Sequence, residues 1–228
     1  MFFALAGCSV APEKTIEMSS SVVERDAQLV GGDQNASIDE EVLYLLMAAE
    51  LAGQRNQYDL ALDAYLQAAK RVDDPRIAER AVKIGLFLKD ERRTQEALDI
   101  WLSKDGKNLS ARKFALLVAI KNANQAVAIE NIKALLLEDP AGFEAGLLEL
   151  VRLFEKEGRV RFTYDALEQV ALQIQDQASV LFVQAVLASM LPDQALAQDK
   201  INRVLQLQPD WNKAIIFQAQ LAGRNGDL

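Results

Sequence analysis

The side chains best able to do chemistry in this sequence are a lone cysteine, Cys8, and two pairs of adjacent carboxylates. The pairs are Asp73-Asp74 and Glu138-Asp139, and each stands directly before a proline. Paired carboxylates can bind a metal ion or exchange protons with a substrate. Because proline ends helices, we expect both pairs to lie in exposed turns and to have no catalytic or metal-binding role.

Composition excludes most other catalytic schemes. The chain has no histidine, so Ser-His-Asp and Cys-His systems, HExxH zinc sites and an imidazole base are absent. One cysteine excludes internal disulfides and zinc sites built on several thiolates. With 33 acids and 25 bases, the net charge of −8 makes the chain a poor general nucleic-acid binder. We therefore expect no enzyme activity, no metal, no cofactor and no nucleic-acid partner.

Cys8 follows the apolar segment Met1–Gly7. The run Leu5-Ala6-Gly7-Cys8 resembles the lipobox of bacterial lipoproteins, where signal peptidase cuts before the cysteine and the thiol carries diacylglycerol. The resemblance implies that residues 1–7 are the remnant of a signal peptide and that Cys8 is lipidated. Ser9, rather than Asp, then implies transfer to the outer membrane. Since residues 1–7 contain no Lys or Arg, we expect the natural chain to begin further upstream; the alternative is an accidental cysteine.

Residues 8–36 are predicted to form a tether. They are rich in Ser, Glu, Gln, Asp and Gly and contain no aromatic residue. As a flexible coil they would span roughly 30 Å. The sequence has no run of 18 apolar residues, so lipid would be the only membrane anchor. From residue 37 to 228 apolar residues recur at spacings of three and four, which predicts an all-α body.

The helices of this body come in pairs. In the segment 45–69, Ala49 and Ala61 are small residues placed where two helices would cross, and Tyr65 and Ala68 follow. This pattern resembles the tetratricopeptide (TPR) repeat. Weaker copies place a second-helix alanine at Ala97, Ala128, Ala166 and Ala197. The resemblance implies an α-solenoid of about five and a half divergent hairpins over 37–228, truncated at the C-terminus. The alternatives are an unrelated α-solenoid and an irregular helical bundle.

Repeat stacks bind partners on a face lined by the first helix of each pair. Aligning the pairs predicts a mainly apolar partner-binding groove. Its residues are Leu46, Glu50, Val82, Leu86, Lys113, Leu117, Val151, Phe182 and Val186. The alternative is that some of these residues belong to the core, because apolar residues at helical spacing are more often core than interface. We expect Trp101 to lie in the core and Trp211 to pack on the preceding pair.

Charge is uneven along the body. Residues 37–68 hold six acids and one base, whereas residues 70–113 hold twelve bases and eight acids. The basic segment is either a strip that meets an acidic partner or anionic lipid, or an ordinary solvated helix face.

Within the TPR family, the chain resembles long lipoproteins that act as adaptors for carboxyl-terminal processing proteases. The resemblance implies a non-catalytic adaptor on the periplasmic side of the outer membrane, with a protease and peptidoglycan hydrolases as protein partners. Self-association through uncapped ends is a further expectation. The alternatives are an assembly factor for a pilus, secretin or polysaccharide-export complex, a platform for an enzyme domain beyond Leu228, and a cytoplasmic scaffold.

Overall fold

A computed structural model describes residues 39–174 and 177–225 of the chain. These residues form eleven helices and no strand, which confirms the predicted all-α repeat fold. The helices are α2 (Glu40–Gln54), α3 (Tyr58–Arg71), α4 (Pro75–Leu88), α5 (Glu91–Lys104), α6 (Leu109–Lys121), α7 (Gln125–Glu138), α8 (Phe143–Lys156), α9 (Val160–Gln173), α10 (Ala178–Ala188), α11 (Gln194–Leu207) and α12 (Asn212–Asn225).

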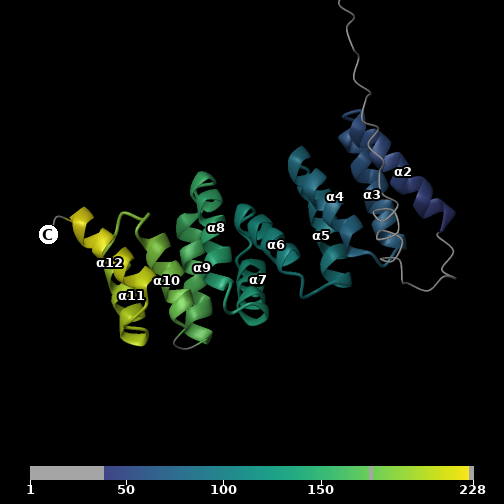
Figure 1. Cartoon of the computed structure of the whole chain (residues 1–228). Helices are drawn as coiled ribbons and strands as arrows, with labels where there is room; N and C mark the ends of the chain where they lie inside the picture. Colours follow the sequence, from purple (N-terminus) through teal and green to yellow (C-terminus); the bar gives the residue numbers. More distant parts are fainter. Residues whose placement is uncertain (1–38, 175–176, 226–228) are drawn as a thin grey trace, which may run out of the picture. The chain divides into compact units, whose positions relative to one another are not determined.

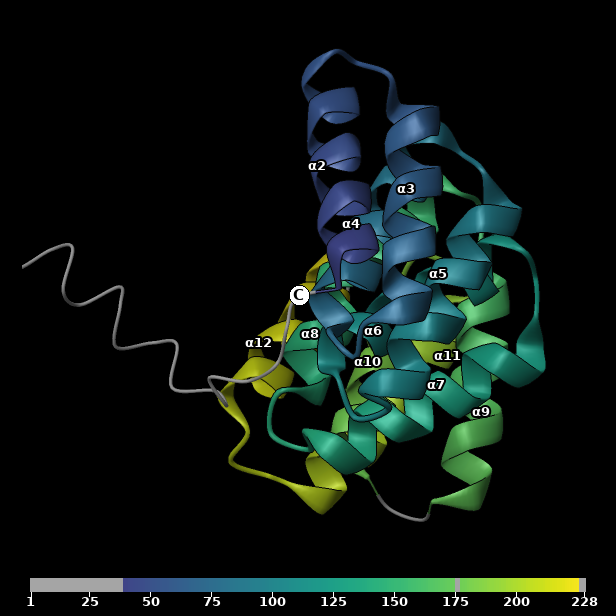
Figure 2. The same cartoon turned by 90° about the vertical axis from the view of Figure 1, so that its right-hand side faces the viewer.

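Most helices pair with the next helix along the chain. The closely packed hairpins are α2–α3, α4–α5, α6–α7 and α10–α11. Each hairpin then contacts the one that follows it, so chain order is also packing order (Figures 1 and 2). Among the residues that the structure describes, prolines fall only at the ends of helices or between them. Pro75, for example, is the first residue of α4, where its missing N–H costs no helical hydrogen bond.

The turn inside each of the first four hairpins has the same geometry. One residue adopts a left-handed backbone with φ between 54° and 65°, and the next residue precedes the second helix. The N–H of that next residue donates to the carbonyl five positions earlier, at 2.8–3.0 Å. This is the Schellman ending of the first helix. The left-handed residues are Asn56, Lys89, Ala123 and Gly158.

These turns fix the repeat register. In each hairpin we count from the residue that precedes the second helix. The fourth residue after it is Ala61, Thr94, Ala128, Thr163 or Ala197. They are separated by 33, 34, 35 and 34 residues, so the repeat is more regular than the sequence pattern indicated. The predicted positions Ala97 and Ala166 were wrong by one helical turn.

Threonine explains that error. Thr94 and Thr163 occupy the small-residue position, and each hydroxyl donates to the carbonyl four residues earlier, at 2.6 and 2.9 Å. Both side chains are therefore buried without an unpaired hydroxyl. A search for alanine alone passes over them and selects the next alanine in the helix.

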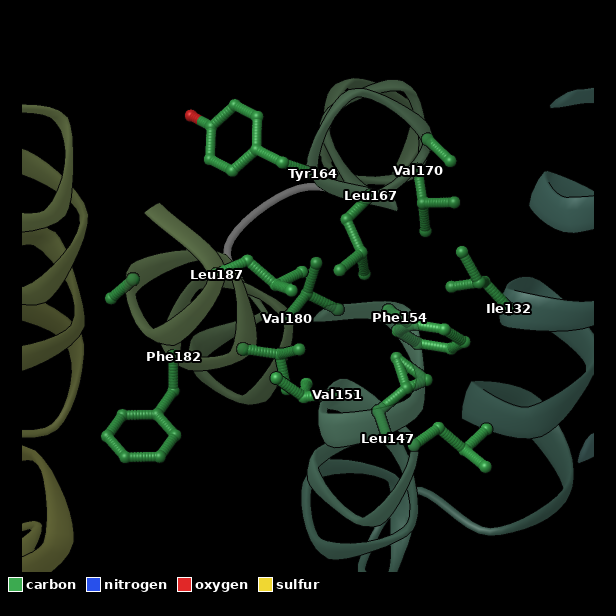
Figure 3. Close-up of a cluster of buried hydrophobic side chains, with 14 of the residues drawn as sticks. Ile132, Leu147, Val151, Phe154, Tyr164, Leu167, Val170, Val180, Phe182 and Leu187 are labelled. Carbon is green, nitrogen blue, oxygen red and sulfur yellow. The ribbon is translucent and has the colours of Figure 1, made fainter. Parts of the chain in front are cut away.

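The fourth pair, α8 and α9, departs from the repeat. Phe154 stands at the turn-aligned position that Gly85 holds in α4, and it is 1% exposed. With Leu147 and Leu167 it fills the space between the two helices (Figure 3). As a result α9 packs mainly on α7 and α10 rather than on its own partner α8.

The core divides into two clusters of buried side chains. The first cluster runs from α2 to α6, and the second runs from α6 to α12. Trp101 is buried in the first cluster, as predicted. Trp211 packs on Phe182 of the preceding hairpin with ring centroids 4.8 Å apart, which confirms the second tryptophan prediction.

Candidate partner-binding surface

Three residues of the predicted groove lie in the core. Val82 is 0% exposed, Val151 3% and Phe182 4%, and each belongs to a buried cluster. The turn register gives the reason for two of them, because Val82 and Val151 align with Ala49, where paired helices cross. Phe182 packs against Trp211, which directly precedes α12, and against Phe217 of α12. These three side chains are not open to a partner.

The other groove residues lie nearer the surface of first helices. Leu46 and Leu86 are half-buried against the first core cluster, and Leu117 and Val186 against the second. Lys113 is half-buried and Glu50 is exposed. The accessible part of the predicted surface is therefore mixed, with apolar edges between charged groups.

Glu50 belongs to a polar cluster that ties three helices together. The hydroxyl of Tyr65 donates to Glu50 Oε1 at 2.5 Å, and Arg80 donates to that hydroxyl at 2.7 Å and also pairs with Glu50. Burial raises the pKa of Tyr65, so the phenol stays protonated and remains a donor. Sequence analysis missed Arg80, which stands 15 residues after Tyr65 as Tyr65 stands 15 after Glu50.

Lys113 crosses from α6 to α8. Its Nζ lies 3.3 Å from Glu149 Oε2, and its chain passes over Gly146, where an added Cβ would lie 3.0 Å from Lys113 Cε. Lys113 and Gly146 line a small hollow of about 40 Å³ together with Asp139 and Phe143. The glycine thus leaves room for the lysine stem, and the lysine head stays near the surface.

Much of the charge imbalance is matched inside the body. Arg80 of the second hairpin pairs with Glu50 of the first, and Arg93 of the second pairs with Asp59 of the first at 2.6 Å. Hydrogen bonds to Asp59 and Asp90 raise the pKa of Arg93. Hydrogen bonds from the backbone and side chain of Arg93 lower the pKa of Asp90. The basic second hairpin therefore meets an acidic partner within the same chain, namely the first hairpin.

Asp73, Asp74 and Asp139 lie between helices, as predicted, whereas Glu138 is the last residue of α7. Asp74 accepts from the backbone N–H of Arg76 at 3.0 Å, and the Arg76 side chain lowers the pKa of Asp74. Asp139 accepts from the N–H of Gly142 at 2.9 Å. Across residues 39–174 and 177–225, no group of three metal-ligating side chains converges. In the same ranges no helix combines the length and apolar character needed to cross a bilayer. Cys8 lies outside the described residues.

Comparison with known proteins gives a partial match. No family model matches the sequence. A TPR repeat-containing protein of Pseudomonas aeruginosa is 36% identical over 118 residues, a match that covers 49% of this chain and 19% of the relative. The chain thus matches about a fifth of that relative's length. This similarity supports the predicted resemblance to TPR repeat proteins.

Solved structures are also similar in fold. The crystal structure of MamA gives a TM-score of 0.47 at 11% identity, covering 77% of this chain and 96% of that one. A tetratricopeptide repeat protein from Parabacteroides merdae gives 0.46 at 12% identity, covering 82% and 75%.

Proposed function

We propose that the protein is a non-catalytic scaffold that holds a protein partner on the first helices of its hairpins. The observation that carries this proposal is the mixed surface of the first helices at the observed register, where Leu46 aligns with Lys113 and Glu50 aligns with Leu117 and Val186. Surfaces that combine apolar and charged side chains are typical of grooves that bind peptides or helices. The similarity to a TPR repeat-containing protein supports the same class of function.

The proposal includes a lipid anchor at Cys8. The lipobox-like run and the polar segment 8–36 support it, since together they would hold the helical body clear of an outer-membrane surface. Lipidation places the body on the periplasmic side. A processing protease and the cell-wall hydrolases that it cleaves are the partners we propose for it, and an assembly role in a pilus, secretin or polysaccharide-export complex is the second candidate.

The test is affinity capture of the tagged full-length protein from its own envelope fraction, followed by mass spectrometry. The adaptor function predicts that a processing protease and cell-wall hydrolases elute together. Pilus, secretin or export components would instead favour the assembly role. Capture of no envelope protein would contradict both.

Two variants sharpen this experiment. Lys113→Glu places a like charge against Glu149 on the first-helix surface, whereas Lys107→Glu does the same against Glu138 in a turn. The lysine–glutamate distances in the two pairs are 3.3 and 3.4 Å, but the Lys113 side chain is 35% exposed and that of Lys107 82%, so circular dichroism must show that Lys113→Glu keeps its helices. We expect only Lys113→Glu to lose partners. Cys8→Ala should leave binding intact in detergent and release the protein from the membrane fraction.

A further inference from the structure

The open side of three first helices carries an excess of bases. We count back from the residue that precedes the second helix, and we call the positions 14, 10, 7 and 3 before it on α4, α6 and α8 the open row. None of the residues at these positions is buried. The row has one acid, Glu149, and six bases, which are Arg76, Arg80, Lys83, Lys121, Arg152 and Lys156. Since the whole chain has more acids than bases, the row is opposite in sign to the molecule as a whole.

The second helices of the same hairpins do not share this excess. Together α5, α7 and α9 contain seven acids and five bases, whereas α4, α6 and α8 contain four acids and eight bases. The bases are therefore segregated to the first helices, on which the proposed partner would lie. A surface of one sign raises the local concentration of ligands of the opposite sign.

Arg80 is held in place with part of its guanidinium group unused. Its Nη1 donates to Tyr65 Oη at 2.7 Å and to Glu50, and its Cζ lies 5.8 Å from the centre of the Tyr65 ring. Tyr65 is 4% exposed, so the ring is a fixed support. Among the described residues nothing accepts from Nε or Nη2 of Arg80, and the side chain is 57% exposed. The edge of the guanidinium that carries these two nitrogens is open to a ligand.

Two other arginines of the chain show what that edge binds. Arg76 holds Asp74 with the same two nitrogens, with Nε 2.9 Å from Oδ1 and Nη2 2.7 Å from Oδ2. Arg93 binds three carboxylates at once, those of Asp59, Asp63 and Asp90. An arginine that already pairs with Glu50 can therefore take a second carboxylate, because its parallel N–H donors match the geometry of that group.

Pairing within the chain does not cancel the charge of the row. Its one acid, Glu149, is matched by Lys113 at 3.3 Å. Arg152 and Lys156 have no ion-pair partner among residues 39–174 and 177–225, and Glu155 beside them offsets only one of the two charges. The part of the row on α8 therefore keeps a positive charge that an acidic ligand would complement.

We propose that the open row binds an acidic segment of a partner protein, in which one Asp or Glu side chain pairs with Nε and Nη2 of Arg80. Phe87, Phe114 and Leu117 fill the row between the bases, and Phe87 is 68% exposed. Apolar side chains between the acids of the segment would therefore find contacts as well. The inference rests on the proposed scaffold function and names the chemistry of its partner. It does not need the lipid anchor.

The test is titration of the full-length protein with a short, fluorescently labelled peptide of Asp, Glu, Leu and Phe whose two ends are blocked. The blocked ends leave side-chain carboxylates as the only anions in the peptide. We expect saturable binding that weakens as salt is added, because exposed charges are screened. A peptide with Asn and Gln in place of Asp and Glu should not bind.

Variants of the cluster around Arg80 should have opposite effects. Arg80→Gln should weaken binding of the acidic peptide about tenfold, because it removes a charged pair of donors. Arg80→Lys keeps the charge but not the parallel donors, so it should recover only part of that loss. Glu50→Gln leaves Tyr65 an acceptor and removes the negative charge next to Arg80, so it should tighten binding about threefold.

The matched control is Arg92→Gln, because Arg92 lies on α5 outside the row, is 78% exposed and pairs with Glu96 at 3.3 Å. Circular dichroism checks that all variants keep their helices. Absence of saturable binding, equal weakening by Arg80→Gln and Arg92→Gln, full recovery in Arg80→Lys or weaker binding in Glu50→Gln would overturn the proposal.

Three further measurements identify other occupants of the row. If vesicles of phosphatidylglycerol bind through Arg80 and displace the peptide, the row meets a lipid surface and the proposal is wrong. If sedimentation shows a dimer that Arg80→Gln dissociates, a second copy supplies the carboxylates and the proposal is also wrong. If neutralising the five acids of residues 9–36 tightens peptide binding tenfold or more, the chain covers its own row and the proposal is overturned. Envelope partners that are lost in Lys113→Glu but kept in Arg80→Gln would overturn this inference and leave the scaffold function standing.

Discussion

Gly85 of α4 lies so close to Thr94 of α5 that a Cβ atom added to the glycine would sit 2.5 Å from Thr94 Oγ1. The contact cannot relax cheaply, because that oxygen donates to the carbonyl of Asp90 at 2.6 Å. Thr94 Cα would also be only 3.2 Å from the new Cβ. The two residues therefore fix how closely the helices of the second hairpin approach.

Gly85→Ala should destabilise the protein. Alanine normally gains about 0.5–1 kcal/mol over glycine inside a helix, but the overpacking costs about 1–3 kcal/mol. We expect a net loss of about 1–2 kcal/mol, measured by urea unfolding followed by circular dichroism. The control is Gly53→Ala in α2, where an added Cβ meets nothing within 4 Å, and it should not lose stability. A Gly85→Ala variant as stable as Gly53→Ala would contradict the steric argument, whereas recovery in Gly85→Ala/Thr94→Ala would support it.

Phe154→Ala should cost much more. The ring is 1% exposed and fills the gap between α8 and α9, where neighbouring hairpins have a small residue (Figure 3). Removing a buried phenylalanine typically costs about 3–5 kcal/mol. The adjacent Leu153 is 40% exposed, so Leu153→Ala should cost under about 1 kcal/mol in the same urea titration. A small effect for Phe154→Ala would mean that α8 and α9 close into an ordinary hairpin when the ring is gone.

The fold could be predicted from the sequence because apolar spacing and proline placement survive divergence. The segment Phe114–Ile120, which is apolar enough for a buried strand, is part of α6, since its flanks favour helix. Prediction failed where it relied on residue identity alone. Threonine replaces alanine at Thr94, and its hydroxyl pairs within its own helix, which no count of small apolar residues detects.

The candidate surface was harder to predict than the fold. The alignment from sequence matched Gly85 with Ala49, one helical turn away from Val82, which is the residue that aligns in the structure. That error placed Val82 on the open side of α4, although its side chain lies in the core. The members of the cluster of Glu50, Tyr65 and Arg80 stand 15 residues apart on three helices, a spacing that has no meaning until the packing of those helices is known. The exposure of Tyr44 and Met47 on α2 was not predicted, because exposure of an apolar position depends on whether a neighbouring helix covers it.

Asp90 should make stability depend on acid pH. Its pKa is lowered in the folded protein by the Arg93 backbone and side chain. A carboxyl with a lowered folded pKa stabilises the fold above its unfolded value of about 3.9, and this contribution is lost as the pH falls through the folded value. Asp90→Asn keeps a cap on α5 but cannot ionise. We expect wild type to be more stable than the variant at pH 7 and the difference to vanish near pH 2.

The measurement is a series of urea unfolding curves between about pH 2 and 7. Asp99→Asn serves as the control, because Asp99 lies exposed on the same helix and accepts from Gln95 rather than from Arg93. A wild-type advantage that stayed constant down to pH 2 would show that Asp90 does not act through its charge.

Gln184 of α10 is a buried amide whose replacement should stabilise the protein. The side chain is 0% exposed, and neither its Oε1 nor its Nε2 has a hydrogen-bond partner among the described residues. A buried polar group without a partner costs about 1–3 kcal/mol, whereas leucine of similar volume would gain contacts with the surrounding apolar side chains. We expect Gln184→Leu to raise the free energy of unfolding by about 1–2 kcal/mol, read from the urea midpoint at unchanged slope. Gln169→Leu, on the exposed side of α9, should change it little. If Gln184→Leu instead lowers stability, the amide must form hydrogen bonds in solution. In that case the packing of the helices around α10 depends on those hydrogen bonds.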